Sequence, residues 1–168
     1  MTIELALREA LRYETSIRDL YVEAARNAGD GEAASFYRAL GKDEASHVAY
    51  LERKLGQWKA EGIVSFEALA SGRFEPGIIQ AAVARAGVPL AGRELGGKVE
   101  ALGRALKAEE ETSSFYRGLV VEVPGEASRL FAAFLDIEEG HTRIVRAELD
   151  LATRTGHWFD LREFDLED

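Results

Sequence analysis

The sequence predicts an all-α protein, a four-helix bundle made of two antiparallel helical hairpins joined by a long crossover connection. Three observations carry this prediction: only three prolines occur, helix-favouring residues dominate the stretches between them, and apolar side chains recur at helical spacing. Because 46% of the 168 residues are hydrophobic, the chain can bury a sizeable core, and residues 1–168 are expected to form a single domain.

The first hairpin is predicted within the proline-free stretch 1–75. Its first helix is expected over residues 3–27, with Gly29 as its stop and Asp30 as the N-cap of the next helix. The second helix would then run to about Ala60 and close at Gly62. The positions at helical spacing are Leu7, Leu11, Glu14, Ile17 and Tyr21 in the first helix, and Phe36, Tyr37, Leu40, His47, Val48 and Leu51 in the second.

Residues 62–95 differ from the rest of the chain because they are rich in glycine and small apolar residues and poor in lysine. We interpret them as the crossover connection, with short helices expected at Ser65–Ala70 and from Pro76 to near Gly87. This connection would either pack against a second copy of the chain, giving a homodimer, or cover the end of its own bundle.

The second hairpin is predicted after the connection. Its first helix is expected from about Leu95 to Val121, and the last helix would begin with Pro124 and run to about Thr155, with Gly156 as its stop. Short turns within each hairpin and a long connection between them give the ferritin-like bundle topology. Periodicity alone leaves other all-helical folds open.

The two halves of the chain repeat one another. The segment LRYETSIRDLY ends at Tyr21 and LKAEEETSSFY ends at Tyr116, and a glutamate, Glu14 or Glu109, stands seven residues before each tyrosine. Each glutamate is followed, 30 or 29 residues later, by the glutamate of a Glu-x-x-His motif. A duplicated helical hairpin explains this better than coincidence. The two motifs are Glu44 with His47 and Glu138 with His141.

Helix geometry makes this repeat a candidate metal site. Residues three or seven apart share a helix face, so the glutamates and histidines of the repeat lie on otherwise apolar stripes. An isolated buried carboxylate is very costly, whereas four carboxylates balance the charge of two divalent ions. Carboxylate and imidazole suit iron and manganese, and di-iron carboxylate bundles use this ligand set. The predicted metal ligands are Glu14, Glu44, His47, Glu109, Glu138 and His141.

Chance is the competing explanation for this pattern. A single Glu-x-x-His is weak evidence, and a lone histidine on an apolar face more often packs in the core than binds a metal. Two of the three histidines have a glutamate three residues before them at matching intervals, which favours a metal site. The third, His157, is not expected to be a ligand.

Three further side chains have two interpretations each. Tyr21 and Tyr116 would either hydrogen-bond the ligand carboxylates or simply pack in the core. Asp43 directly precedes a predicted ligand, so it would either orient a histidine or be a solvated surface charge, and the sequence favours the surface charge.

The run Glu109, Glu110 and Glu111 is expected to contain one ligand only. Glu110 and Glu111 lie over basic residues at helical spacing, so they should form an ion-paired, solvated face. Glu109 is placed inward by the residues that share its stripe, which are Leu102, Leu106, Thr112 and Tyr116.

Composition excludes several other classes of protein. The chain has no cysteine, which removes disulfides, zinc ribbons, thiolate iron–sulfur sites and thiol nucleophiles. A net charge of −9 without a long basic run argues against nucleic acid and anionic membranes as partners. No secretory h-region and no apolar stretch of about 20 residues is visible, so we expect a cytoplasmic protein.

The chain resembles the rubrerythrin-like branch of the ferritin-like superfamily. The resemblance rests on YETSIRDLYVEAA, YRALGKDEASH, AEEETSSFY and LDIEEGH, and it covers both halves except the connection. It implies a non-haem di-iron centre that reacts with dioxygen or peroxide. By position, Glu14 and Glu109 would be terminal ligands, Glu44 and Glu138 would bridge the two metals, and His47 and His141 would each bind one metal.

Several features of that family are absent here. Rubrerythrins proper carry a CxxC iron domain and an extra glutamate three residues after the ligand of their third helix, where this chain has Thr112. The symmetric six-ligand set is similar to that of bacterioferritin. The only methionine is Met1, so a methionine-ligated haem is not expected. The chain also lacks an evident fifth helix of the kind that helps ferritins form a closed shell.

The expected function is therefore that of a di-iron oxidoreductase, which oxidises ferrous iron with dioxygen or hydrogen peroxide. Its cofactors would be two iron ions, with manganese or a mixed pair as alternatives, and turnover would need a separate electron donor. The first alternative is a metal-binding bundle that serves iron handling or partner interaction without turnover. An oxygenase acting on an organic substrate is the second.

Overall fold

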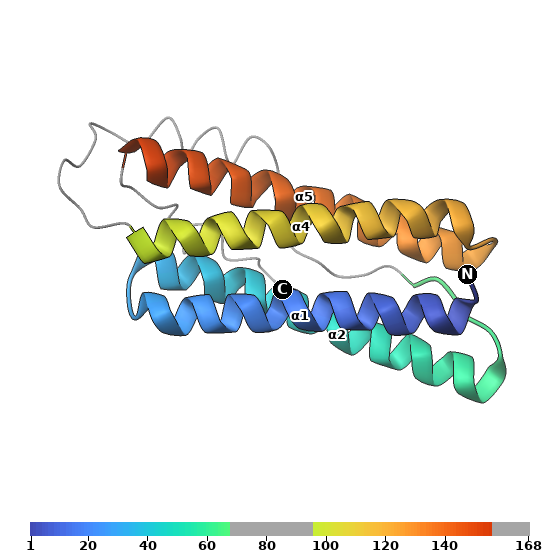
Figure 1. Ribbon diagram of the computed structural model, residues 1–168. Coiled ribbons are helices and arrows are strands. Elements are labelled where there is room, and N and C mark those ends of the chain that lie inside the picture. The colour runs from blue at the N-terminus through green and yellow to red at the C-terminus, as the bar shows by residue number, and fades with distance from the viewer. Residues whose placement is uncertain (68–95, 156–168) are drawn as a thin grey trace.

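The computed structural model describes residues 1–67 and 96–155, and these form a four-helix bundle (Figure 1). The described part of the chain contains no strand, so the predicted all-α class is confirmed. None of its helices is long and apolar enough to cross a membrane. The four helices are α1 (Ile3–Ala28), α2 (Glu32–Glu61), α4 (Gly96–Glu122) and α5 (Glu126–Thr155).

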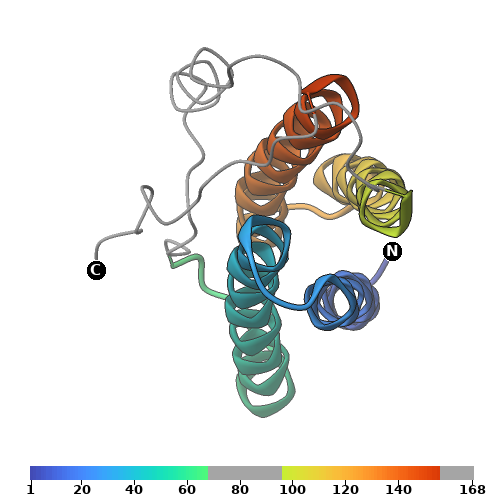
Figure 2. The same cartoon turned by 90° about the vertical axis from the view of Figure 1, so that its left-hand side faces the viewer.

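The helices pair as two antiparallel hairpins, α1 with α2 and α4 with α5, and α1 also packs along α4. Viewed along its length, the bundle shows the four helices around a shared interior (Figure 2). In Figure 1, α2 ends on the right and α4 begins on the left, so the last residue of α2 and the first residue of α4 lie at opposite ends of the bundle. The predicted short helix after Pro76 lies outside the described residues, and residues 65–67 are not helical.

The predicted helix stops are confirmed where the structure describes them. Gly29 ends α1 with a φ of 73°, and Gly62 ends α2 in the left-handed region, a conformation that glycine adopts without steric cost. Gly156 lies outside the described residues.

Two predicted helix starts are wrong. Gly31, not Asp30, is the N-cap of α2, because the turn needs a φ of 113° there, which only glycine adopts readily. Helix α5 begins at Glu126 and not at Pro124, because Gly125 between them has a φ of 74° and interrupts the helical path.

The buried core consists of two apolar clusters separated by a polar layer. One cluster contains Tyr21, Leu40 and Leu102, and the other contains Leu7 and Tyr116. Every helix contributes to both clusters, and on every helix the buried glutamate or Glu-x-x-His pair stands between its two contributions. The helical periodicity of the sequence thereby places one polar layer in the middle of an otherwise apolar bundle.

Candidate metal centre

The polar layer contains all six predicted metal ligands. Helices α1 and α4 each supply one glutamate, and α2 and α5 each supply a glutamate and a histidine one turn apart. All six side chains have 0% exposure, so the bundle shields them completely from solvent. They are Glu14, Glu44, His47, Glu109, Glu138 and His141.

These side chains form two overlapping groups that could each hold a metal ion. Within each group the candidate ligand atoms lie within 4.8 Å of one another. Glu44 and Glu138 belong to both groups, whereas Glu14 and His47 belong only to the first and Glu109 and His141 only to the second. The arrangement therefore offers two adjacent metal positions that share Glu44 and Glu138.

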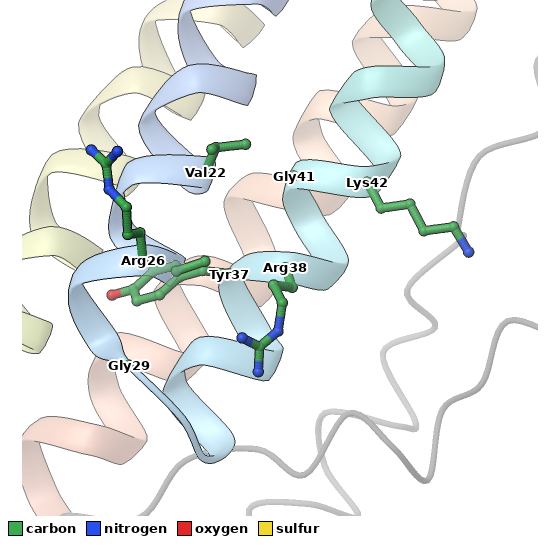
Figure 3. A pocket seen from close by; sticks show the side chains of 8 residues that line it. Val22, Arg26, Gly29, Tyr37, Arg38, Gly41 and Lys42 are labelled. Atoms are coloured by element: carbon green, nitrogen blue, oxygen red, sulfur yellow. The ribbon is translucent and has the colours of Figure 1, made fainter.

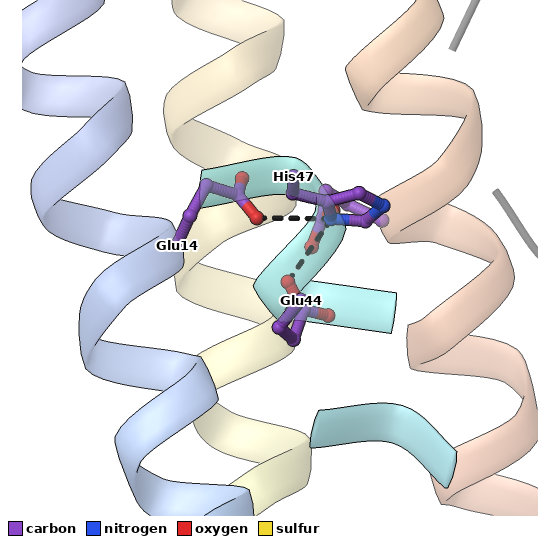
Figure 4. A group of neighbouring side chains, drawn as sticks. Glu14, Glu44 and His47 are labelled. Carbon is purple, nitrogen blue, oxygen red and sulfur yellow. Dashed lines mark hydrogen bonds and ion pairs between the residues drawn. The ribbon is translucent and has the colours of Figure 1, made fainter. Parts of the chain in front are cut away.

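The shared glutamates turn one oxygen toward each imidazole. Glu44 Oε2 lies 3.1 Å from Nδ1 of His47, and its Oε1 lies 2.7 Å from Nδ1 of His141. Glu138 repeats this arrangement at 3.6 Å and 3.9 Å from the same two nitrogens. Glu14 Oε2 lies 3.1 Å from Nδ1 of His47 on the terminal side (Figure 4). Each shared carboxylate is thus placed as a bridging carboxylate would be.

The donor atoms fit a metal pair because several of them have no other function in the fold. Glu109 Oε2 and both carboxylate oxygens of Glu138 are buried and accept no hydrogen bond from the described part of the chain, and Glu44 Oε1 faces Nδ1 of His141. Buried carboxylate oxygens rarely lack a partner, because the desolvation cost is then uncompensated. Hard cations are the natural partners of such oxygens, and imidazole nitrogen is compatible with iron, manganese and zinc.

The two tyrosines reach across the bundle to the terminal glutamates. Tyr21 on α1 donates its hydroxyl to Glu109 Oε1 on α4, and Tyr116 on α4 donates to Glu14 Oε1 on α1, both at 2.5 Å. Of the two interpretations that the sequence left open, contact with the carboxylates is correct. Each tyrosine contacts the glutamate of the other repeat, which ties α1 to α4 through the centre.

Asp43 is not the solvated surface charge that the sequence favoured. It is 8% exposed, and its Oδ2 lies 2.9 Å from Nε2 of His141 on α5. The signal that could have placed it is helix phase, because Asp43 stands three residues after the buried Leu40 and four before the buried His47.

Burial raises the pKa of three of the four buried glutamates when no metal is bound. Burial, reinforced by the charge of Glu44, raises the pKa of Glu14 to about 8. Burial also raises the pKa of Glu109 to about 7 against the attraction of His141, and raises that of Glu138 well above its usual range. Burial alone would raise the pKa of Glu44 too, but the two imidazoles outweigh it and lower the value.

The two imidazoles have raised pKa values because the carboxylates around them favour the protonated form. Burial alone would lower the pKa of His47, but the charge of Glu44 and hydrogen bonds to Glu14 and Glu44 raise it to about 10. The pKa of His141 is likewise raised, since Glu44 and Asp43 outweigh its burial. Protons thus compensate the buried carboxylates, and metal ions would have to displace them.

The other two members of the glutamate run lie outside the polar layer, as predicted. Glu111 is exposed and lies 3.8 Å from Lys107 one turn away. Glu110 forms its ion pair with Arg146 on α5, not with the basic residues of its own helix. Helix phase therefore indicated the correct face but not the partner on the neighbouring helix.

Two hollows in the surface lie away from the centre. One, of about 480 Å³, lies between α1 and α2 and is lined by Val22, Ala25, Tyr37 and Gly41 among others (Figure 3). The other, of about 340 Å³, lies beside Tyr37 and the start of α4. None of the six buried glutamates and histidines lines either hollow, so neither offers an organic substrate a place beside these six side chains.

The metal-free protein should lose stability as the pH rises from 6 to 9. In the unfolded chain, glutamate and histidine release their protons near pH 4.5 and 6.5, whereas Glu109, Glu14 and His47 hold theirs until about pH 7, 8 and 10 when folded. The folded state then binds more protons than the unfolded state, and each rise in pH favours unfolding. Urea unfolding at both pH values should show this fall, and added Mn²⁺ should reverse it. A free energy of unfolding that is constant or rises over this interval would contradict the account.

Single glutamate-to-alanine substitutions at positions 109, 110 and 111 should show which of the three glutamates binds metal. Glu109→Ala should impair metal binding, measured by elemental analysis after metal loading and desalting, because it removes a terminal ligand. Glu110→Ala and Glu111→Ala should bind metal as the parent chain does and change the free energy of unfolding by about 0.5 kcal/mol or less. Loss of metal in either of these two exposed variants, with metal retained in Glu109→Ala, would overturn the site.

Known proteins give no guide to this centre. Comparisons with protein-family models, with curated proteins and with solved structures find no match to the chain. Its chemistry is therefore inferred from the geometry, burial and charge of its own side chains.

Proposed function

We propose that the protein is a ferritin-like di-iron oxidoreductase that binds two iron ions and oxidises ferrous iron with dioxygen or hydrogen peroxide. The observation that carries this proposal is the pair of shared glutamates, Glu44 and Glu138, each with one oxygen facing each imidazole. A site for one ion would not need two overlapping groups of donors with a histidine at each end.

The charge of the donor set supports a pair of divalent ions. Four carboxylates carry four negative charges when deprotonated, and two neutral imidazoles add none, so two divalent cations make the layer neutral. That neutrality matters because all six side chains lie in the shielded interior, where an uncompensated charge is very costly. Oxygen and imidazole donors favour iron or manganese, and the absence of cysteine from the chain argues against copper(I) and cluster chemistry.

The arrangement of the helices supports the ferritin-like part of the proposal. Helices α2 and α4 run in the same direction, so the end of α2 and the start of α4 lie at opposite ends of the bundle (Figure 1). Di-iron carboxylate bundles take one glutamate from each of two helices and a Glu-x-x-His from each of the other two, as here.

The bound pair would supply two electrons, one from each ferrous ion, to the oxidant. Glu44 and Glu138 would be shared by the two ions, and Glu14 and Glu109 would each hold one ion. Hydrogen bonds from Tyr116 and Tyr21 fix one oxygen of each terminal carboxylate.

In the metal-free protein these carboxyls hold protons because burial raises their pKa values, and binding of the two ions would release those protons. Reduction of hydrogen peroxide to two waters by two ferrous ions would consume two protons, which would be taken up from solvent or from groups beside the centre. Repeated turnover then requires an external reductant to return the iron to the ferrous state.

Anaerobic titration with ferrous iron tests the proposal and should reach about two ions per chain. Oxygen or peroxide added afterwards should be consumed as the iron becomes ferric, followed with an oxygen electrode and by absorbance. The double variant Glu44→Ala, Glu138→Ala should lose both ions, because each position needs these glutamates.

A matched control is Glu52→Ala, Glu139→Ala, which removes two glutamates from the same two helices outside the buried layer. It should bind and oxidise iron as the parent chain does. Two bound ions without consumption of either oxidant would reject the oxidoreductase and leave the metal-binding bundle. An unchanged iron content in the Glu44, Glu138 variant would reject the site itself.

A further inference from the structure

The two halves of the internal repeat differ at the position just before each Glu-x-x-His motif. Glu44 and His47 of α2 occupy the same places in the repeat as Glu138 and His141 of α5. The residue before Glu44 is Asp43, but the residue before Glu138 is Ile137. An acid in the first half therefore corresponds to an aliphatic side chain in the second, although the six candidate ligands themselves are the same in both halves.

This unmatched acid contacts one imidazole at hydrogen-bond distance. Asp43 Oδ2 lies 2.9 Å from Nε2 of His141 on the opposite hairpin, but 3.9 Å from Nε2 of His47 on its own helix. A bond of 2.9 Å is a normal N–H···O hydrogen bond, whereas 3.9 Å is too long for one. The carboxylate thus acts on His141 and not on His47.

The contact fixes which nitrogen of His141 faces the centre. Nδ1 of His141 points toward Glu44, Glu109 and Glu138. When Nε2–H donates to Asp43, the lone pair is left on Nδ1, directed at the place where a metal would be bound. A carboxylate behind a ligating imidazole sets its tautomer and orientation and raises its basicity.

We propose that Asp43 is a positioning residue that strengthens only one of the two metal positions, the one formed by Glu109 and His141. The Glu109–His141 position is therefore the one that loses affinity when Asp43 is removed. This inference rests on the proposed two-metal function, and it adds to the six candidate ligands a further residue that acts on one position only.

Zn²⁺ is the probe for the test, because it takes the same donors and does not react with dioxygen. Two background variants each leave one metal position intact. Glu14→Gln disables the His47 position, and Glu109→Gln disables the His141 position. Titration calorimetry should show that Asp43→Ala weakens Zn²⁺ binding in the Glu14→Gln chain by about 10- to 100-fold. In the Glu109→Gln chain, the same substitution should change the affinity by about twofold or less.

Two further variants separate positioning from packing and from charge. Asp43→Asn keeps the shape and a neutral acceptor, so it should retain part of the affinity that Asp43→Ala loses. Asp136→Ala removes an exposed acid two residues before Glu138 and should leave both affinities unchanged. In spectra of ¹⁵N-histidine-labelled, Zn²⁺-loaded full-ligand chain, Asp43→Ala should shift the Nε2–H signal of His141 much more than that of His47.

If Asp43→Ala weakens Zn²⁺ binding equally in the Glu14→Gln and Glu109→Gln chains, or in neither, the inference is wrong but the two-metal centre stands. If Glu14→Gln or Glu109→Gln binds Zn²⁺ too weakly to titrate, the test uses the chain that keeps all six candidate ligands. Its isotherm should show two binding steps, and Asp43→Ala must then reduce the Zn²⁺ affinity of one step only. A full-ligand chain that binds no Zn²⁺ or iron would overturn the proposed function, and this inference with it.

Discussion

The rest of the structure depends on the cost of holding four carboxylates and two imidazoles inside an apolar bundle. All six side chains are shielded from solvent, and three of the carboxylate oxygens, on Glu109 and Glu138, have no hydrogen-bond partner in the described part of the chain. Water cannot compensate such groups, so protons or cations must. The raised pKa values of Glu14, Glu109 and Glu138 indicate compensation by protons. The two overlapping donor groups are suited to compensation by metal cations.

The fold supports this layer from both sides. Apolar clusters above and below it provide the burial that stabilises the bundle, so the polar layer need not be stabilising in itself. Tyr21 and Tyr116 belong to these clusters yet extend their hydroxyls to Glu109 and Glu14, which joins the apolar core to the centre. Stability and metal affinity are consequently linked, because what relieves the buried charge also holds the four helices together.

Helix periodicity and the internal repeat were enough to predict the four helices, the six converging side chains and the inward position of Glu109. Both signals report which face of a helix a residue occupies, and burial decides that face. They do not report what lies across the interface, which is why the Glu110–Arg146 pair and the Asp43–His141 contact were not predicted. The two misplaced helix starts depend on the backbone angles of Gly31 and Gly125, which composition does not reveal.

The most direct test of the central claim is anomalous diffraction at the iron absorption edge, from crystals of protein loaded anaerobically with ferrous iron. Two anomalous peaks per chain are expected, about 3.5–4 Å apart, with Glu44 and Glu138 between them and one histidine beside each. A single peak, or iron bound only at surface carboxylates with the six buried side chains unoccupied, would contradict it.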